Sequence, residues 1–77
     1  MILARLSGLN GKKLVEFVGK FWFVYSHTAR SHTVCWHSDG RITVIPYHSG
    51  EEIGPGLLNK IIKKDLGITR EEFLKKI

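Results

Sequence analysis

The dipeptide Asp39-Gly40 constrains the fold of this chain more than any other feature of its sequence. It separates two runs that are rich in β-branched and aromatic residues, residues 31–37 (SHTVCWH) and residues 41–46 (RITVIP). Asp-Gly between two such runs is the usual sign of a two-residue, type I′ hairpin turn. We therefore predict two antiparallel strands in which Ser38 pairs with Arg41, and this pairing sets the register of the whole hairpin.

This register divides the side chains of the hairpin between two faces, because neighbouring residues of a strand point to opposite sides. The first set is compact and suits a protein core: Thr33, Cys35, His37, Ile42 and Val44. The second set contains larger side chains around one histidine: His32, Val34, Trp36, Thr43, Ile45 and Tyr47. We predict that the first set is buried and that the second is an exposed binding surface. The reverse assignment, with Trp36 in the core, remains open.

The other segments predict helices and one further strand. Residues 10–19 (NGKKLVEFVG) have an apolar helical face, and Asn10 is a candidate N-cap. Thr69-x-x-Glu72 is a capping box that begins a last helix. The expected order is a helix over 10–19, a strand over 21–26, a loop over 27–30, the two hairpin strands, a helix from 55 to 67 and a short helix over 69–77. This order indicates an α+β fold in which the helices cover one face of a three-stranded antiparallel sheet.

Length and composition place further limits on the protein. With 77 residues the chain is expected to form a single domain over residues 1–77. The formal net charge of +5 favours a polyanionic partner such as nucleic acid. The one cysteine, Cys35, cannot form an internal disulfide, and the apolar runs are too short to cross a bilayer. We therefore expect a cytoplasmic protein with no membrane association.

The stretch from Arg30 to Phe73 resembles the HicA toxins, which are small ribonucleases of toxin–antitoxin modules. Members of that family carry Gly-Ser-His at the start of the second strand, and then a hairpin, a Pro-x-His segment, a Gly-Thr-Leu-like helix opening, Gly-Ile-Ser and Glu-Glu-Phe. The matching residues here are Ser31-His32, Asp39-Gly40-Arg41, Pro46-Tyr47-His48, Gly56 with Leu58, Gly67-Ile68-Thr69 and Glu72-Phe73, and Gly11-Lys12 resembles the start of the family's first helix. The chain departs from the family at Arg30, where the family has glycine, and at Leu57, where it has threonine.

This resemblance implies a fold similar to double-stranded RNA-binding domains, with the order α-β-β-β-α. It implies a type II toxin that acts as an endoribonuclease, or mRNA interferase, without a metal ion. It also implies that the strand histidine, here His32, is the essential catalytic residue. The partners implied are mRNA and a HicB-like antitoxin that inhibits the toxin, and no cofactor is implied.

Such chemistry needs few protein groups, because RNA carries its own nucleophile in the 2′-hydroxyl. Histidine can accept or donate a proton near neutral pH, so His32 is the candidate general base or acid. Ser31 is a supporting residue that orients His32 or donates to a phosphate oxygen. Arg30 is the candidate for stabilising negative charge on the phosphate.

Further candidates are weaker. His48 is a possible second proton donor, although a role in the loop is at least as plausible from the sequence. Lys60, Lys63 and Lys64 form a cationic helix face that either binds the phosphate backbone or is merely solvated. His27 is expected to be a solvated loop residue, and His37 to be structural.

Two other functions stay open at this point. One is an RNA-binding module of the same fold that has lost catalysis through Arg30. The other is a zinc site made from Cys35 and histidines, which the sequence disfavours because it has no Cys-x-x-Cys motif.

Overall fold

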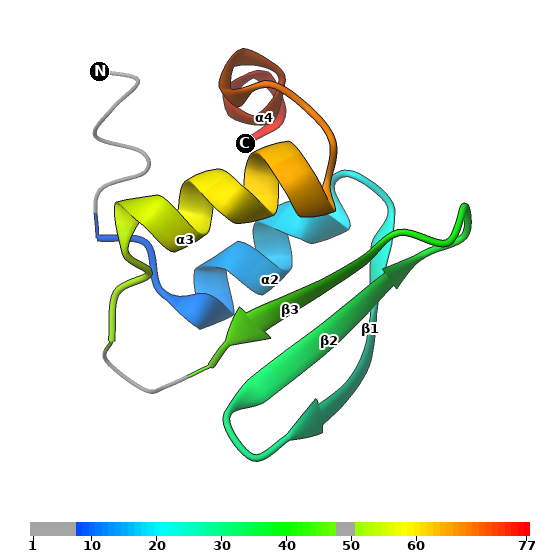
Figure 1. Ribbon diagram of the computed structural model, residues 1–77, viewed down its shortest axis with the longest axis vertical. Coiled ribbons are helices and arrows are strands. Elements are labelled where there is room, and N and C mark those ends of the chain that lie inside the picture. Colours follow the sequence, from blue (N-terminus) through cyan, green and yellow to red (C-terminus); the bar gives the residue numbers. More distant parts are fainter. Residues whose placement is uncertain (1–7, 48–50) are drawn as a thin grey trace.

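The computed structural model describes residues 8–47 and 51–77, in which helices cover one face of a small sheet (Figure 1). The strands form one antiparallel sheet in the order β1-β2-β3. Helix α2 contacts β1 and β3, while η1 contacts β3 and α4. The elements are α2 (Gly11–Gly19), β1 (Phe23–Ala29), β2 (His32–His37), β3 (Ile42–Pro46), α3 (Pro55–Lys60), η1 (Ile61–Asp65) and α4 (Arg70–Lys76). This arrangement confirms the predicted α+β fold and is compatible with that of double-stranded RNA-binding domains.

The predicted helix starts are confirmed in atomic detail. The Asn10 side chain accepts a hydrogen bond of 2.9 Å from the Lys13 backbone N–H, and so caps α2. Thr69 Oγ1 accepts from the Glu72 N–H at 3.0 Å, and the Glu72 carboxylate accepts from the Thr69 N–H at 2.9 Å. These side chains satisfy backbone donors that have no partner inside a helix, and they fix where α2 and α4 begin.

The core lies between the sheet and the helix layer. Phe73 of α4 is fully buried, with the ring of Phe21 stacked at 5.5 Å between centroids and the ring of Phe17 edge-on at 6.2 Å. The other buried apolar residues come from every layer of the structure: Leu9, Leu14, Val18, Phe23, Cys35, Ile45, Ile53, Leu58, Ile61, Ile62 and Leu66. Burying such side chains supplies most of the favourable free energy of folding.

The segment η1 is a π-helical turn, in which the Leu66 N–H donates to the Ile61 carbonyl five residues earlier. This wider turn lets Lys60 and Asp65 form a salt bridge of 3.2 Å. The Asp65 carboxylate also accepts a hydrogen bond of 3.0 Å from the hydroxyl of Thr43, a buried residue of β3. The hydrogen bond between Asp65 and Thr43 therefore links η1 to β3, an edge strand of the sheet.

The predicted type I′ turn at Asp39-Gly40 is wrong. The loop has three residues, Ser38 to Gly40, closed by hydrogen bonds from the His37 N–H to the Arg41 carbonyl at 2.8 Å and from the Gly40 N–H to the His37 carbonyl at 2.9 Å. Within this loop only Gly40 has a positive φ, of 100°. One positive φ after a turn is the pattern of a three-residue hairpin loop, whereas type I′ requires two.

The longer loop shifts the register by one residue, so Trp36 pairs with Ile42, and His32 pairs with Pro46 rather than with Tyr47. A shift of one residue moves every side chain of a strand to the other face. Thr43 and Ile45 are therefore buried, and Ile42 and Val44 are exposed, opposite to the prediction for β3. The prediction for β2 is correct, with Thr33 and Cys35 buried and His32 and Trp36 exposed.

The carboxylate of Asp39 explains why the loop closes over three residues. Asp39 Oδ1 accepts from the Arg41 backbone N–H at 3.0 Å, and Oδ2 accepts from the Arg41 guanidinium at 2.8 Å. The hydrogen bond from the backbone N–H is the main reason that the pKa of Asp39 lies below its ordinary value. Because the folded state lowers this pKa, the interaction stabilises the fold above the ordinary pKa of aspartate and is lost as the pH falls through the lowered value.

The predicted loop over residues 27–30 is also wrong. Strand β1 continues to Ala29, which pairs with His32, so the turn between β1 and β2 contains only Arg30 and Ser31. The residues at this end of β1 are all exposed and lack the apolar alternation by which a strand is recognised in a sequence.

Gly11 lies where α2 starts against the end of β3. It is buried, and a Cβ atom at this position would collide with the carbonyl oxygen of Pro46 and lie 3.0 Å from the Cα of Tyr47. Both neighbours are backbone atoms, which cannot rotate away as a side chain can. Because Gly11 has no side chain, the start of α2 can pack closely against Pro46, the β3 residue that pairs with His32.

Candidate active site

The sheet has one face that no described helix covers, which we call the open face. Its exposed apolar side chains include Val24, Trp36 and Ile42, which are 67%, 53% and 51% exposed. The strand pairing places nine side chains on it, in three rows across the sheet: Val24–Trp36–Ile42, His27–Val34–Val44 and Ala29–His32–Pro46. The open face is thus an apolar surface that contains two imidazoles and no formally charged side chain.

His32 lies at the end of this surface that is nearest the β1–β2 turn. It is the first residue of β2 and pairs with Ala29 on one side and Pro46 on the other. Its side chain is exposed, as the sequence predicts. Next to it, the carbonyl of Ser31 accepts a hydrogen bond from the Tyr47 N–H, which ties the turn to the end of β3. The imidazole is therefore accessible to a large substrate and is held on a paired strand.

Arg30 occupies the first position of the two-residue turn with a φ of 57°. A positive φ at the first turn residue alone is the pattern of a type II′ hairpin turn, where glycine is preferred. The glycine that HicA toxins carry at this position is therefore explained by backbone geometry. Its replacement by arginine keeps the turn, at a cost in strain, and adds a cation beside Ser31 and His32.

We predict that Arg30→Gly raises the free energy of unfolding by about 1 kcal/mol, because glycine adopts a positive φ without strain. If this end of the sheet binds RNA, the same variant is expected to bind it more weakly, because one cation beside His32 is lost. Thermal unfolding and RNA-binding measurements check the two effects. Arg30→Ala is the matched control, since it removes the charge and keeps the strain. Equal stability of the two variants would contradict this account of the turn.

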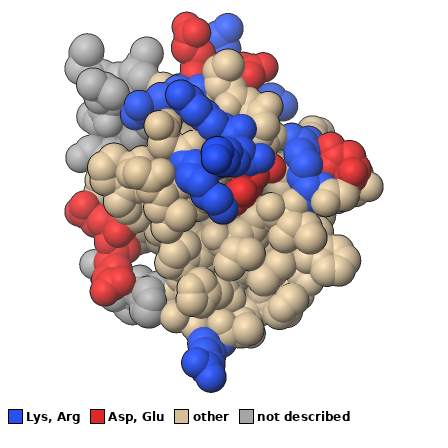
Figure 2. Space-filling model, viewed as in Figure 1, with Lys and Arg blue, Asp and Glu red and all other residues tan. Residues whose placement is uncertain are grey.

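The predicted lysine face lies away from His32. Basic side chains gather over the α3–η1 segment, whereas the sheet region of the same view is largely uncharged (Figure 2). Lys63 and Lys64 are exposed there, while Lys60 is engaged by Asp65. These lysines belong to the helix layer, and His32 faces the opposite side of the sheet. An RNA strand would have to cross the β3 edge to reach both.

Two further histidines of the sequence are His37 and His48. His48 lies outside the described residues. His37 packs edge-on against Phe23, with ring centroids 5.2 Å apart, and lies 2.9 Å from the Asp39 carboxylate at the far end of β2. Its contacts are those of the structural residue that the sequence predicts.

Cys35 is buried on the helix side of the sheet, and burial raises the pKa of its thiol. A metal-binding thiol must be deprotonated, so this environment disfavours a metal ligand. Within residues 8–47 and 51–77, no three His, Cys, Asp or Glu side chains lie close enough together to hold a metal ion.

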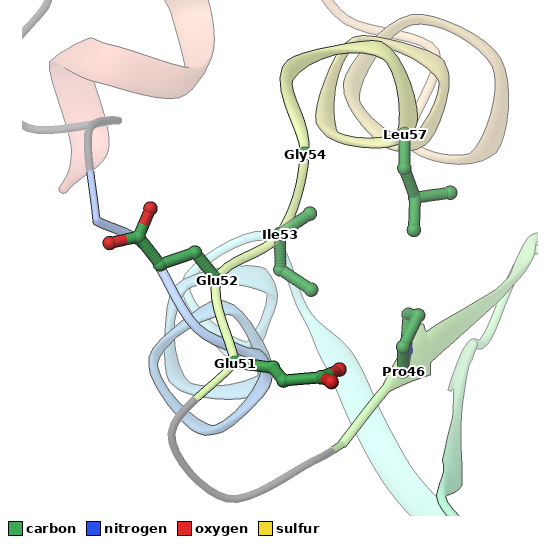
Figure 3. A pocket seen from close by; sticks show the side chains of 6 residues that line it. All are labelled: Pro46, Glu51, Glu52, Ile53, Gly54 and Leu57. Carbon is green, nitrogen blue, oxygen red and sulfur yellow. The ribbon is translucent and has the colours of Figure 1, made fainter.

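A pocket of about 280 Å³ lies beside the end of β3 (Figure 3). Pro46, Ile53 and Leu57 point into it, the carboxylate of Glu51 reaches across its rim, and Glu52 points away. The Glu51 carboxylate makes this pocket unsuitable for a phosphate group. The open face, with its exposed imidazoles, is therefore a better candidate than this pocket for a site that acts on a phosphate.

His27, which the sequence places in a loop, lies in β1, where it pairs with Val34. Two hydrogen bonds fix the orientation of its strand: Tyr25 Oη lies 3.1 Å from Thr28 Oγ1, which lies 3.2 Å from the hydroxyl of buried Thr33. Thr28 therefore faces the helix side, and His27 faces the open side with His32. Tyr25 and Thr28 share a face because the register shifts at Ser26, which is an extra residue in β1 known as a β-bulge.

These features define a class of protein: a small α+β chain, similar in topology to double-stranded RNA-binding domains, with exposed histidine on its open sheet face. The family model described as HicA toxin of bacterial toxin-antitoxin matches residues 11–68, and the chain therefore belongs to the HicA toxin family. Its role is that of a toxin in a toxin–antitoxin system. A search of curated proteins found no match. None of the helices in the part of the chain that the structure describes has the length and apolarity needed to cross a membrane.

Proposed function

We propose that this toxin is an endoribonuclease that cleaves mRNA in the cytoplasm without a metal ion, with His32 as its general base or acid. The observation that carries the proposal is the exposed His32 on the open face of the sheet, next to the Arg30-Ser31 turn. Membership of a toxin family makes RNA cleavage the activity to test first.

The proposed reaction uses the 2′-hydroxyl of RNA as the nucleophile. Neutral His32 removes the proton from this hydroxyl, and its oxygen forms a bond to the adjacent phosphorus. The bond from phosphorus to the 5′ oxygen breaks, which leaves a 2′,3′-cyclic phosphate on one fragment and a 5′-hydroxyl on the other. The guanidinium of Arg30 supplies positive charge near the crowded phosphate.

The composition of the open face suits single-stranded RNA better than a regular duplex. Trp36 is 53% exposed and lies four residues along β2 from His32, on the same face. An exposed aromatic ring on a sheet offers a stacking surface for an unpaired base. The apolar side chains on either side of it, Val24 and Ile42, extend that surface across the sheet. We propose that mRNA lies along β2 with a base on Trp36 and a phosphate at His32.

Incubation of the purified protein with RNA in EDTA tests the proposal. We expect fragments that end in 2′,3′-cyclic phosphate, formed by the unmodified protein and not by its His32→Ala variant. Arg30 in place of the family's glycine supports one alternative, a binding module that no longer cleaves. RNA binding without cleavage by the unmodified protein would favour that alternative over a nuclease.

We also propose that a HicB-like antitoxin inhibits the toxin by covering the open face. Exposed apolar side chains around His32 and a net charge of +5 suit an acidic partner with an apolar contact surface. Addition of the antitoxin is expected to protect His32 from chemical modification of its imidazole. A modification rate that does not change in the complex would argue against direct occlusion.

A further inference from the structure

We propose that His27 is the second proton-transfer residue of the site and protonates the 5′ oxygen that leaves when His32 activates the 2′-hydroxyl. This inference rests on the proposed ribonuclease activity. It assigns a catalytic role to a residue that sequence analysis places in a solvated loop.

The register of the sheet brings the two histidines together. His27 pairs with Val34, and His32 lies two residues before Val34 on the same strand. The two histidines are therefore diagonal neighbours across β1 and β2, and such positions are roughly 7–8 Å apart on one face of a sheet. A phosphate that accepts a hydrogen bond from a ring on each side, at about 2.8 Å, fits between imidazoles at this separation.

The β-bulge is what places His27 there. Tyr25 pairs with Cys35, so without an extra residue Ser26 would lie opposite Val34 and His27 would face the helices opposite Thr33. The insertion at Ser26 moves His27 to the open face. Bulges are frequent beside active sites, where they redirect a side chain.

The Ser26 side chain also orients the imidazole ring of His27. Its hydroxyl oxygen lies 3.0 Å from His27 Nδ1. A hydroxyl can donate to a neutral imidazole and accept from a protonated one, so this contact is compatible with both states of the ring. With Nδ1 engaged, Nε2 is the nitrogen that is left to approach a substrate.

Among residues 8–47 and 51–77, the surroundings of the two histidines offer few other groups that could protonate the leaving oxygen. The remaining side chains of the open face are apolar and cannot transfer protons: Val24, Ala29, Val34, Trp36, Ile42, Val44 and Pro46. The polar residues nearest to His32 in the register are Arg30, Ser31 and Tyr47. Arginine keeps its proton in proteins, so Arg30 can stabilise negative charge but cannot protonate the leaving oxygen. Cys35 and His37 lie on the helix side of the sheet.

In the proposed step, neutral His32 gains the proton of the 2′-hydroxyl, and the 2′ oxygen bonds to phosphorus. The bond from phosphorus to the 5′ oxygen breaks, and protonated His27 gives its proton to that oxygen. The step consumes no water and needs no oxidant or cofactor. Afterwards His32 is protonated and His27 is neutral, and exchange of protons with solvent restores both.

The test compares two substrates at a bond that the unmodified protein cleaves, one of them with sulfur in place of the bridging 5′ oxygen. A thiolate leaves without being protonated, so it does not need a general acid. His27→Gln is expected to cleave the oxygen substrate about 10²–10⁴-fold more slowly than the unmodified protein and to regain most of its rate on the sulfur substrate. His32→Gln is expected to be slow on both substrates.

The pH dependence of kcat/KM gives a second measure. A base and an acid together produce a bell-shaped profile, and the acid is responsible for the fall at high pH. For His27→Gln, the decrease of kcat/KM at high pH is expected to disappear. Full activity of His27→Gln on the oxygen substrate, or an equal loss on both substrates, would overturn the assignment. The same would follow if His48→Gln, and not His27→Gln, were rescued by sulfur. An unmodified protein that cleaves neither substrate would refute the proposed function itself.

Discussion

Replacement of His32 by alanine is expected to lower the rate of RNA cleavage by about 10²–10⁴-fold while the protein stays folded. The loss follows from the proposed chemistry, because an alanine methyl group cannot take the proton of the 2′-hydroxyl. Folding should be preserved because the His32 side chain is exposed on the open face and is not part of the core. Substitutions at exposed positions of this kind usually change stability by less than about 0.5 kcal/mol.

The measurement combines cleavage rates in EDTA with thermal unfolding of the same preparations. Ser31→Ala is a useful comparison, because it alters the neighbouring residue and leaves the imidazole in place. We expect a smaller loss for Ser31→Ala than for His32→Ala, since the role that we propose for Ser31 is only a supporting one. A His32→Ala protein that is folded and cleaves RNA at the unmodified rate would exclude His32 as base or acid.

Replacement of Gly11 by alanine is expected to destabilise the protein by about 3 kcal/mol. The added methyl group would collide with the Pro46 carbonyl and press on the backbone of Tyr47, and neither can move without displacing the end of β3. Overpacking of a close contact commonly costs about 1–3 kcal/mol, and rigid backbone neighbours put this site at the upper end. For a domain of this size, each 1 kcal/mol lowers Tm by about 4–8 °C.

Gly19→Ala is the matched control, because Gly19 belongs to the same helix and a Cβ atom there meets nothing within 4 Å. This variant is expected to be as stable as the unmodified protein or slightly more stable, since alanine favours helix by roughly 0.5–1 kcal/mol over glycine. Thermal unfolding of the two variants side by side gives the difference. Equal Tm values for Gly11→Ala and Gly19→Ala would show that the contact with β3 relaxes easily.

The helices could be predicted from the sequence because their signals are local. A capping residue, a helical spacing of apolar residues and a closing glycine lie within a few positions of one another, and Asn10, Thr69 and Gly67 all act as expected. The register of the hairpin could not be predicted in the same way. Asp-Gly is compatible with a two-residue and a three-residue loop, and the choice depends on the hydrogen bonds that Asp39 makes to Arg41.

The site could be predicted only in part, for a similar reason. The exposed position of His32 follows from the alternation along β2, and the structure agrees. The role that we propose for His27 could not be predicted from the sequence. The polar end of β1 has no apolar alternation, and the extra residue at Ser26 determines which face of the sheet His27 is on. One signal could have helped. A glycine before Ser-His in the related toxins indicates a tight turn at Arg30, which requires a strand immediately before it.

Because the described helices lie on one side of the sheet, the core and the surface that we propose for recognition are on different sides of the same three strands (Figure 1). Under the proposed function, mutations at Trp36, Ile42 or Val44 are expected to alter binding more than stability, because these side chains are exposed and are not part of the core. The proposed binding surface can therefore change in sequence while the core stays the same.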